Sequence, residues 1–361
     1  MYIEKLSYKN FRNLEDCSVN FDKGVNILYG DNGQGKTNIL EAIYFTATGR
    51  SHRTHLDKDL IKFGLDESYM QSLVINDGIS DKIDVHIKKF KKKGIAVNGL
   101  PVKKLNSLFG VLLVVIFSPE DLSLVKAGPS ERRRFIDMEL CQVNPIYYYE
   151  LGQYYLCLRQ RNNLLKTLKK NSGLSDTIFV WDKQLVNHGI KIMALREAFV
   201  KKLDKISQKI HSDITNGKEF LRTEYKPNTT AEDFEEKLKK NLDRDIILGS
   251  TSVGVHKDDC LMFINDIEVK SFGSQGQQRT ASLATKLAGI ELIYNEKNTH
   301  PVLLLDDVLS ELDRHRQEFL ISRLKDIQTI ITCTGVEDLL SKVENANMYK
   351  VKLGALYDTD K

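Results

Sequence analysis

The sequence predicts an α/β protein: a mixed sheet with flanking helices, interrupted by an inserted, mostly α-helical lobe. Three observations support this fold class. Residues 25–28 form a short apolar run that meets a glycine-rich loop and then a helix-forming segment. Residues 301–305 form a second apolar run that ends in two acids. Between residues 151 and 206, large apolar side chains recur every seven positions, which is typical of helices packed side by side.

Composition limits the classes of protein that fit. The chain has 361 residues, enough for two or three domains or subdomains, and its net charge of +4 means that any polyanion site must arise by local clustering. The five cysteines form no C-x-x-C pair, so they suggest neither a zinc site nor a disulfide framework. The start of the chain lacks an apolar signal core, and the longest apolar run is far too short to span a bilayer. We therefore expect a cytoplasmic protein with no membrane partner.

The first hundred residues predict strands and one phosphate-binding loop. Residues 2–8, 17–21 and 25–28 have strand patterns. The octapeptide GDNGQGKT that follows fits G-x-x-x-x-G-K-[ST], the Walker A pattern, and precedes a helix over residues 38–44. In such a loop the lysine reaches the β- and γ-phosphates and the threonine hydroxyl holds Mg²⁺. The expected nucleotide-binding residues are Gly30, Asp31, Asn32, Gly33, Gln34, Gly35, Lys36 and Thr37.

Basic residues gather in two places after this helix. Residues 49–54 form a basic loop, and residues 68–98 have the pattern of antiparallel strands with turns at 93–94 and 98–99. The lysines here either cover a solvated strand face or line a groove for nucleic-acid phosphates. The candidate DNA-binding residues are Arg50, Arg53, Lys88, Lys89, Lys91, Lys92 and Lys93.

The middle of the chain predicts the helical lobe. Residues 111–117 form a buried strand, and three arginines at 132–134 then open a helix; they are either surface charge or ligands for phosphates or carboxylates across an interface. The heptad pattern of residues 138–245 predicts a helical hairpin. Residues 229–232 have capping-box spacing before another helix, in which Phe234, Leu238 and Leu242 share one face.

The last third predicts the other half of an ATPase. Residues 251–263 return to a strand-like pattern with a polar interruption, where we expect His256 to form hydrogen bonds within its lobe. A second anion site is expected just before a helix over 280–294. The apolar strand 301–305 then ends at Asp306, expected in the Mg²⁺ shell, and Asp307, expected to polarise the attacking water. The candidate residues of the anion site are Ser274, Gln275, Gly276 and Gln277, and the catalytic candidates are Lys36 and Asp307.

A further strand over residues 328–333 completes the expected ATPase, which would use ATP and Mg²⁺. We divide the chain into an ATPase lobe at 1–120, a helical insertion at 121–250, and the remainder of the ATPase lobe at 251–361.

These motifs, taken together, resemble the ABC-type ATPases of chromosome maintenance, and specifically the RecF family. The segments NFRNLED and GDNGQGKTNILEAIYF are shared with SMC-like heads, and the insertion is much shorter than the coiled coil of an SMC chain. The discriminating segments are GRSHRT, SPEDLSLVKAGPSERRRFID, RQRNNLLK, TSVGVHKDD, SQGQQRT and LLLDDVLSELDRHRQEFL.

The resemblance implies a P-loop ABC-type ATPase head and an ATP-dependent DNA-binding protein of gap repair. Such a protein binds single-stranded, gapped and double-stranded DNA and works with RecO and RecR, and through them with RecA, in replication and the SOS response. It also implies a weak, DNA-stimulated ATPase used as a switch. We expect a homodimer that forms only with ATP, because Ser274 would meet the phosphates held by Lys36 of a second copy.

The sequence departs from the family pattern at several places. Ala127 stands where a glycine is frequent, and Gly254-Val255-His256 replaces Gly-Pro-His. The residue that would serve as the switch is either Cys333 or Thr334.

Two other interpretations stay open at this point. An ABC transporter ATPase subunit would share the nucleotide motifs, although the NFRN start and the large insertion argue against it. An SMC-like structural head without turnover would not need Lys36, Thr37, Asp306 and Asp307 all intact.

Overall fold

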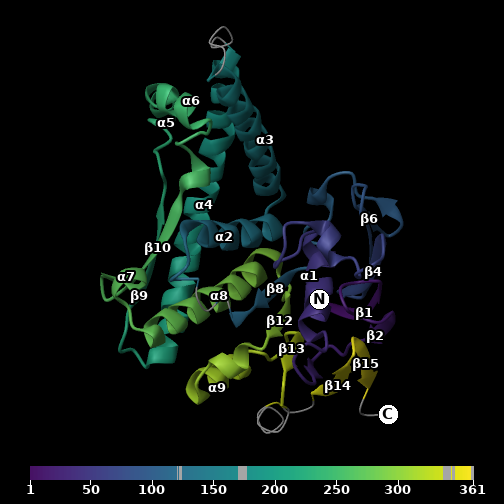
Figure 1. Ribbon diagram of the computed structural model, residues 1–361. Helices are drawn as coiled ribbons and strands as arrows, with labels where there is room; N and C mark the ends of the chain where they lie inside the picture. Colours follow the sequence, from purple (N-terminus) through teal and green to yellow (C-terminus); the bar gives the residue numbers. More distant parts are fainter. Residues whose placement is uncertain (120, 122–123, 170–176, 336–342, 344–345, 359–361) are drawn as a thin grey trace. The chain divides into compact units, whose positions relative to one another are not determined.

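The computed structural model describes residues 1–119, 121, 124–169, 177–335, 343 and 346–358 (Figure 1). The chain forms two compact units, the first from residues 1–122 and 289–361 and the second from residues 123–288. The second unit thus extends beyond residue 250, where our sequence-based division ended the helical lobe. The reason is that residues 259–264 pair as a strand with residues 221–226 inside this unit.

The first unit contains a mixed sheet that positions both nucleotide motifs. Its strand order is β15-β14-β3-β13-β12-β8; all neighbours are parallel except β14 and β15. Strands β12 and β13 are buried along their whole length, as their continuous apolar runs predict. The bounds are β3 Val25–Tyr29, β8 Val114–Phe117, β12 Val302–Asp306, β13 Thr329–Cys333, β14 Asn347–Lys352 and β15 Ala355–Asp358.

Helices and short turns accompany this sheet. The helix α1 (Lys36–Thr48) follows β3, as the sequence predicts, and a short 3-10 helix, Val308–Glu311, follows β12. The helix α9 (Arg314–Ser322) lies between β12 and β13 in the chain. Strands β14 and β15 were not predicted.

The second sheet of this unit is antiparallel, with the order β2-β1-β4-β5-β6-β7. Asp77 and Gly78, which have φ angles of 48° and 80°, form the turn that joins β4 to β5; our sequence analysis missed it. Asn98 and Gly99, with φ angles of 52° and 78°, form the predicted turn between β6 and β7. The bounds are β1 Tyr2–Lys9, β2 Cys17–Asn20, β4 Glu67–Asn76, β5 Ile79–Lys88, β6 Gly94–Val97 and β7 Leu100–Pro101.

The second unit is built on the predicted helical hairpin. Helices α3 (Pro145–Leu168) and α4 (Ile178–Thr215) pack together. The predicted heptad positions are buried, except Leu151 and Ile206, which are half-buried. The predicted capping box at 229–232 is not formed; instead Thr230 Oγ1 accepts a hydrogen bond from the Asp233 amide at 3.1 Å. The following helix breaks at Asn241, so the predicted single face is divided. The other helices are α2 Pro129–Val143, α5 Phe234–Lys240, α6 Leu242–Leu248, α7 Val269–Phe272 and α8 Gln275–Lys297, which continues into the first unit from residue 289.

A three-stranded antiparallel sheet, in the order β11-β10-β9, completes this unit. The strand β9 (Leu221–Lys226) lies within the stretch that we expected to be mostly helical. The strand β10 (Asp259–Ile264) starts only after the polar segment that we expected to interrupt it, where a short 3-10 helix forms instead. The strand β11 is Ile267–Glu268.

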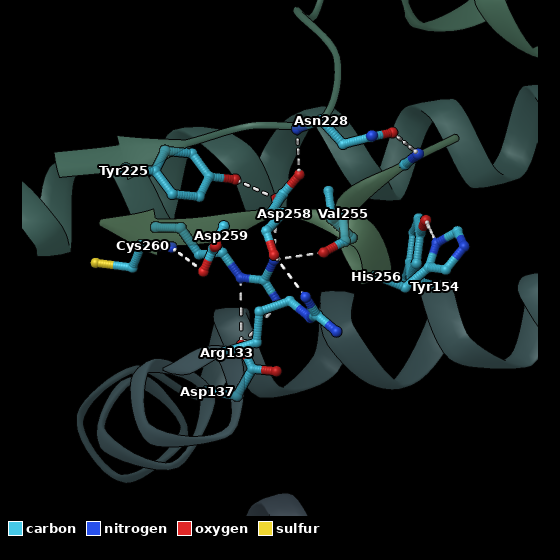
Figure 2. A network of polar contacts seen from close by, with 12 residues as sticks. Arg133, Asp137, Tyr154, Tyr225, Asn228, Val255, His256, Asp258, Asp259 and Cys260 are labelled. Atoms are coloured by element: carbon cyan, nitrogen blue, oxygen red, sulfur yellow. Dashed lines mark hydrogen bonds and ion pairs between the residues drawn. The ribbon is translucent and has the colours of Figure 1, made fainter. Parts of the chain in front are cut away.

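A buried polar network joins the strands and helices of the second unit around Asp258 (Figure 2). The Asp258 carboxylate accepts hydrogen bonds from Arg196 Nη1 at 3.0 Å, from the Asn228 amide at 2.8 Å and from the Tyr225 hydroxyl. Arg196 is only 1% exposed and also binds Asp137 at 2.8 Å. A charged side chain is tolerated at this depth because its charge is paired and its donors are used.

The arginine triplet at 132–134 serves the same unit. Arg132 binds both carboxylate oxygens of Asp259, at 2.7 and 2.8 Å, and Arg133 donates to the Asp258 carbonyl at 2.6 Å. Neither of these two guanidinium groups is therefore simple surface charge. Arg134 lies 3.9 Å from Glu131 on the same helix.

His256 has a fixed tautomer in this network. Its Nε2 lies 3.0 Å from the Thr251 carbonyl, which only accepts, so Nε2 carries the proton and Nδ1 accepts from the Tyr154 hydroxyl at 2.7 Å. Burial lowers the pKa of His256 to about 4. Among the described residues, no group of three His, Cys, Asp or Glu could hold a metal ion, and no helix is long and apolar enough to cross a membrane.

We expect acid to destabilise the second unit through His256. Its folded pKa of about 4 lies below the unfolded value of about 6.5, so the unfolded chain binds the proton first as the pH falls. The contribution of neutral His256 to the free energy of unfolding is present above pH 6.5. It is lost as the pH falls from 6.5 to 4, and the loss is roughly 3 kcal/mol. Urea unfolding followed through Trp181, the single tryptophan, measures the loss.

The variant His256→Gln should flatten this profile, whereas His55→Gln, at an exposed histidine, should leave it unchanged. If wild type and His256→Gln lose the same unfolding free energy in acid, other groups than His256 cause that loss.

Candidate functional site

The loop between β3 and α1 can only be made with glycine at its turning points. Gly30, Gly33 and Gly35 have φ angles of 146°, 80° and 105°. A Cβ atom on Gly30 would lie 2.4 Å from the Val351 carbonyl oxygen, and one on Gly35 would lie 2.6 Å from a methyl group of Leu14. The loop therefore turns tightly with its backbone packed against neighbouring segments, as the motif predicts.

Lys36 opens α1 and points back into this loop. The side chain is buried, and its Nζ donates to the carbonyl oxygens of Gly30 at 2.7 Å and Asp31 at 3.0 Å. The ammonium group is thus held in the concave side of the loop, near the positive end of the helix. Both features favour an anion at this position.

Asp306 lies at the carboxyl end of β12, where it meets the same loop. Its Oδ1 accepts hydrogen bonds from Thr37 Oγ1 at 2.8 Å and from Thr332 Oγ1 at 2.9 Å. The register explains this arrangement, because Asp306 and Thr332 are opposite each other in β12 and β13, and Thr332 is opposite Leu28 in β3. Parallel strands end at one edge of the sheet, where ligands bind in open α/β folds.

The pKa of Asp306 is raised above its ordinary value, mainly because the carboxyl group is buried. Burial raises its pKa, the hydrogen bonds from Thr37 and Thr332 oppose the rise, and the neighbouring Asp307 adds to it. A divalent cation would stabilise the charged form and offset the effect of burial, since Mg²⁺ prefers hard oxygen ligands such as a carboxylate and a hydroxyl. The residues present therefore fit a Mg²⁺ site.

Asp307 adopts a left-handed backbone conformation, with φ 50°. Thr332 Oγ1 accepts from its amide at 2.9 Å, and Ser310 Oγ donates to its carbonyl at 2.6 Å. The backbone is thus fixed from two sides while the side chain stays half-buried beside Asp306. Of the two expected switch positions, Cys333 is buried, which raises its pKa to about 11, and Thr334 is exposed.

A buried carboxylate that our sequence analysis did not single out, Glu41, ties α1 to two loops. It accepts two hydrogen bonds from Arg12, at 2.9 and 2.8 Å, and another from Ser51, and Arg53 lies 3.5 Å away. Burial alone would raise the pKa of Glu41, but the hydrogen bonds from Arg12 and Ser51 outweigh it and lower the pKa. The signal available in the sequence was a glutamate within the otherwise apolar helix NILEAIYF.

Arg53, a candidate DNA-binding residue, is exposed and also contacts α1. Its Nη1 donates to Asn38 Oδ1 at 2.8 Å, two residues after Lys36. Asn38 in turn donates to Asn13 Oδ1 at 2.6 Å, and Asn13 donates to the Gly33 carbonyl at 3.1 Å. This chain of contacts reaches the phosphate loop.

The hairpin of β14 and β15 also supports the phosphate loop. Its turn residues Leu353 and Gly354 have φ angles of 51° and 81°. The Leu353 amide donates to Gln34 Oε1 at 2.6 Å, and the Gly354 amide donates to the Gln34 carbonyl at 2.9 Å. Gln34, expected to bind nucleotide, therefore has its side-chain oxygen occupied by this turn. No local pattern indicates this contact, because it joins residues at distant positions in the chain.

The lysines at the end of β5 and in the loop after it differ in the partners of their side chains. Lys93 donates to the Gly49 carbonyl at 2.6 Å and lies 2.9 Å from Asp57, so it holds its own loop in place. Lys88 and Lys89 lie 3.9 and 3.3 Å from the acids Glu67 and Asp66. Among the described residues, Lys91 and Lys92 make no ion pair. Arg50 is exposed.

The second expected anion segment belongs to the second unit, whereas the phosphate loop belongs to the first. Its helix, α8, begins at Gln275 rather than Thr280. Ser274 Oγ accepts from the Gln277 amide at 3.2 Å, and the Ser274 amide donates to Gln277 Oε1 at 2.9 Å. This is a reciprocal cap that leaves Ser274 exposed at the helix N-terminus.

Comparison with known proteins gives consistent results across the chain. The family model described as the RecF/RecN/SMC N-terminal domain matches residues 2–355. The protein named DNA replication and repair protein RecF from Lachnoclostridium phytofermentans is 47% identical over 99% of both chains, and that from Lachnospira eligens is 49% identical over 98% of both.

Two solved structures are also similar to this chain. A structure described as the recombination mediator protein RecF with ATP, in the RecFOR pathway, has a TM-score of 0.92 and 36% identity, covering 99% of this chain and 97% of its own. An Smc head bound to the C-winged helix domain of ScpA has a TM-score of 0.58 at 16% identity, covers 100% of this chain and 98% of its own, and shares the fold.

We expect Gly354→Ala to loosen the phosphate loop. The variant would place a Cβ at φ 81°, only 2.6 Å from the Asn13 carbonyl oxygen, whereas Gly78→Ala has a nearly equal φ of 80° and open space around it. The left-handed backbone should destabilise both alanine variants by about 1–2 kcal/mol. The clash should destabilise Gly354→Ala alone by about a further 1–3 kcal/mol.

Chemical unfolding and amide hydrogen exchange at residues 30–37 measure the effect. Faster exchange in Gly354→Ala than in Gly78→Ala is expected, and equal exchange would show that the hairpin does not restrain the loop.

Proposed function

Because this chain belongs to the RecF family of DNA replication and repair proteins, we propose that it is an ATP-dependent DNA-binding switch of recombinational repair. It would act at single-strand gaps and stalled forks with RecO and RecR to help load RecA, in the bacterial cytoplasm, and so support replication and SOS induction. The observation that carries the proposal is the joining of Lys36, Thr37 and Asp306 at one sheet edge. Membership of the family removes the transporter-subunit alternative.

ATP would bind in the phosphate loop, with residues 30–37 around its phosphates. Lys36 Nζ now donates to the carbonyl oxygens of Gly30 and Asp31. With ATP bound, it would donate to phosphate oxygens instead. Thr37 and Asp306 would hold Mg²⁺, which supplies charge neutralisation for phosphoryl transfer when bound. A relative described as bound to ATP supports this assignment.

Asp307 would orient and polarise the attacking water. Its neighbour Asp306 is occupied by two hydroxyl groups, whereas the Asp307 side chain makes no hydrogen bond within the described part of the chain. Its backbone is fixed by Thr332 and Ser310, so the carboxylate is presented from a rigid support. Hydrolysis would be slow and would serve to release the protein from DNA.

The second unit would complete the site of another copy. Ser274 and the amides that begin α8 form an anion site of their own. Two copies related by a two-fold axis would each hold ATP between Lys36 of one chain and Ser274 of the other. The nucleotide would thereby join the dimer, and its hydrolysis would open it.

We expect Asp307→Asn to bind ATP but to lower the hydrolysis rate by about 10²-fold or more, because an amide takes no proton from water. Asparagine accepts the left-handed backbone of Asp307, so the fold should persist. The matched control is Asp326→Asn, since Asp326 is an exposed aspartate with φ 65°. Phosphate release at saturating ATP and DNA is the measurement, and an undiminished rate in Asp307→Asn would remove this role.

We expect Ser274→Arg to abolish the ATP-dependent dimer and to spare ATP binding by the monomer. The arginine would fill the anion site, while Lys36 and Thr37 are unchanged. Ser271→Arg is the control, because it adds the same side chain at an exposed serine of the same unit. Sedimentation velocity with and without ATP decides the matter: an ATP-bound Ser274→Arg dimer would refute the shared site.

A further inference from the structure

An exposed aromatic side chain stands in the middle of the basic loop between β5 and β6. Phe90 is 84% exposed, and the loop around it reads Lys88-Lys89-Phe90-Lys91-Lys92-Lys93. A single exposed apolar residue needs no explanation by itself. An aromatic ring surrounded by five lysines is a chemically distinct surface, and this combination carries the inference.

Contacts with other segments hold both ends of this loop. At one end the Lys89 amide donates to the Asp66 carbonyl at 2.9 Å. At the other end Lys93 is bound to Gly49 and Asp57 and lies over the ring of Phe45, 5.0 Å from its centroid. The ring of Phe90 is therefore presented to solvent from a loop with both ends fixed.

Charge at the tip is only partly neutralised. Lys89 pairs with Asp66 and lies 5.4 Å from the Phe90 ring centroid, while Lys91 and Lys92 make no ion pair within the described residues. Two unpaired lysines thus follow Phe90 directly in the chain and remain available to an external polyanion. A nucleic acid carries both groups that this surface fits, a phosphate for each lysine and a flat π-face for the ring.

We infer that Phe90 stacks on an unpaired base while Lys91 and Lys92 contact the flanking phosphates, so that this loop is a single-strand-binding element. The inference deepens the proposed DNA binding and rests on it. A base within an intact duplex has both faces covered by its neighbours, so the ring selects single-stranded stretches such as a gap. An acidic protein surface would use the lysines but offers no base for the ring.

The same unit provides a matched control in Phe63. Its side chain is fully exposed, at 103%, but its surroundings are mixed in charge: Lys62 is paired with Glu15 at 3.2 Å, and Asp66 follows. Phe63→Ala therefore removes an equally exposed ring without a basic cluster around it.

The experiment measures binding of the full chain to fluorescein-labelled oligo(dT) and to heparin, a polyanion without bases, over a range of salt. Phe90→Ala and Phe90→Leu should each weaken oligo(dT) binding about tenfold, equivalent to about 1.4 kcal/mol. Neither should change heparin binding or the slope of log affinity against log salt. Phe90→Trp should restore oligo(dT) binding, and Phe63→Ala should bind as wild type does.

Replacing Lys91 and Lys92 by alanine should weaken binding of both polymers and reduce the salt slope for oligo(dT) by about 0.7 for each phosphate that is no longer neutralised. In a Trp181→Phe background, the emission of a tryptophan at position 90 should be quenched by oligo(dT) and not by heparin. Thermal melting should be the same for all Phe90 variants, because the ring is exposed.

The outcomes separate the inference from the function on which it rests. Wild type that binds no DNA refutes both. Wild type that binds oligo(dT), with Phe90→Ala or Phe90→Leu binding equally well, refutes base stacking alone. Equal weakening of oligo(dT), heparin and poly-glutamate binding in Phe90→Ala also overturns it, and points to an acidic protein partner.

Discussion

The carboxylate of Asp306 has to be satisfied where it is buried, and much of the first unit follows from that requirement. An ionised group without partners at this depth would cost several kcal/mol. Its partners are the hydroxyl of Thr37, 269 positions away in the chain, and that of Thr332 on the adjacent strand. Both lie within reach only if β3, β13 and β12 are neighbours in parallel and in this register. The hydrogen bonds of Asp306 therefore require the same strand order and register that the sheet has.

The parts of the fold that were predictable from the sequence have strong local patterns. The glycine loop between an apolar strand and a helix, the run that ends in Asp306, and the heptads of α3 and α4 are each determined by residues close together in the chain. The strand β9 was missed because LRTEYK is short and polar, and becomes a strand only by pairing with β10. Strands β14 and β15 were missed for the same reason.

The candidate site also contains residues that local motifs predict and contacts that they do not. Lys36, Thr37 and Asp306 belong to motifs whose chemistry can be identified locally, and the structure brings them together. The contact of Glu41 with Arg12 could not be predicted from spacing, because an ion pair depends on which loop folds over which helix. Lys91 and Lys93 illustrate this within one loop. They are the same residue type two positions apart, yet within the described part of the chain only the Lys93 side chain forms an ion pair.

The docking of the β14–β15 turn onto Gln34 has a consequence for how the protein is made. The strands of the antiparallel sheet lie within the first 101 residues and can pair early during synthesis. The phosphate loop follows β3 in the chain, but Leu353 and Gly354 emerge from the ribosome more than three hundred residues later. At about 5–20 residues per second this delay is on the order of 15–60 s. Throughout that time the phosphate loop lacks its hydrogen bonds with Leu353 and Gly354, so the loop gains its full set of contacts only after the C-terminal hairpin has been synthesised.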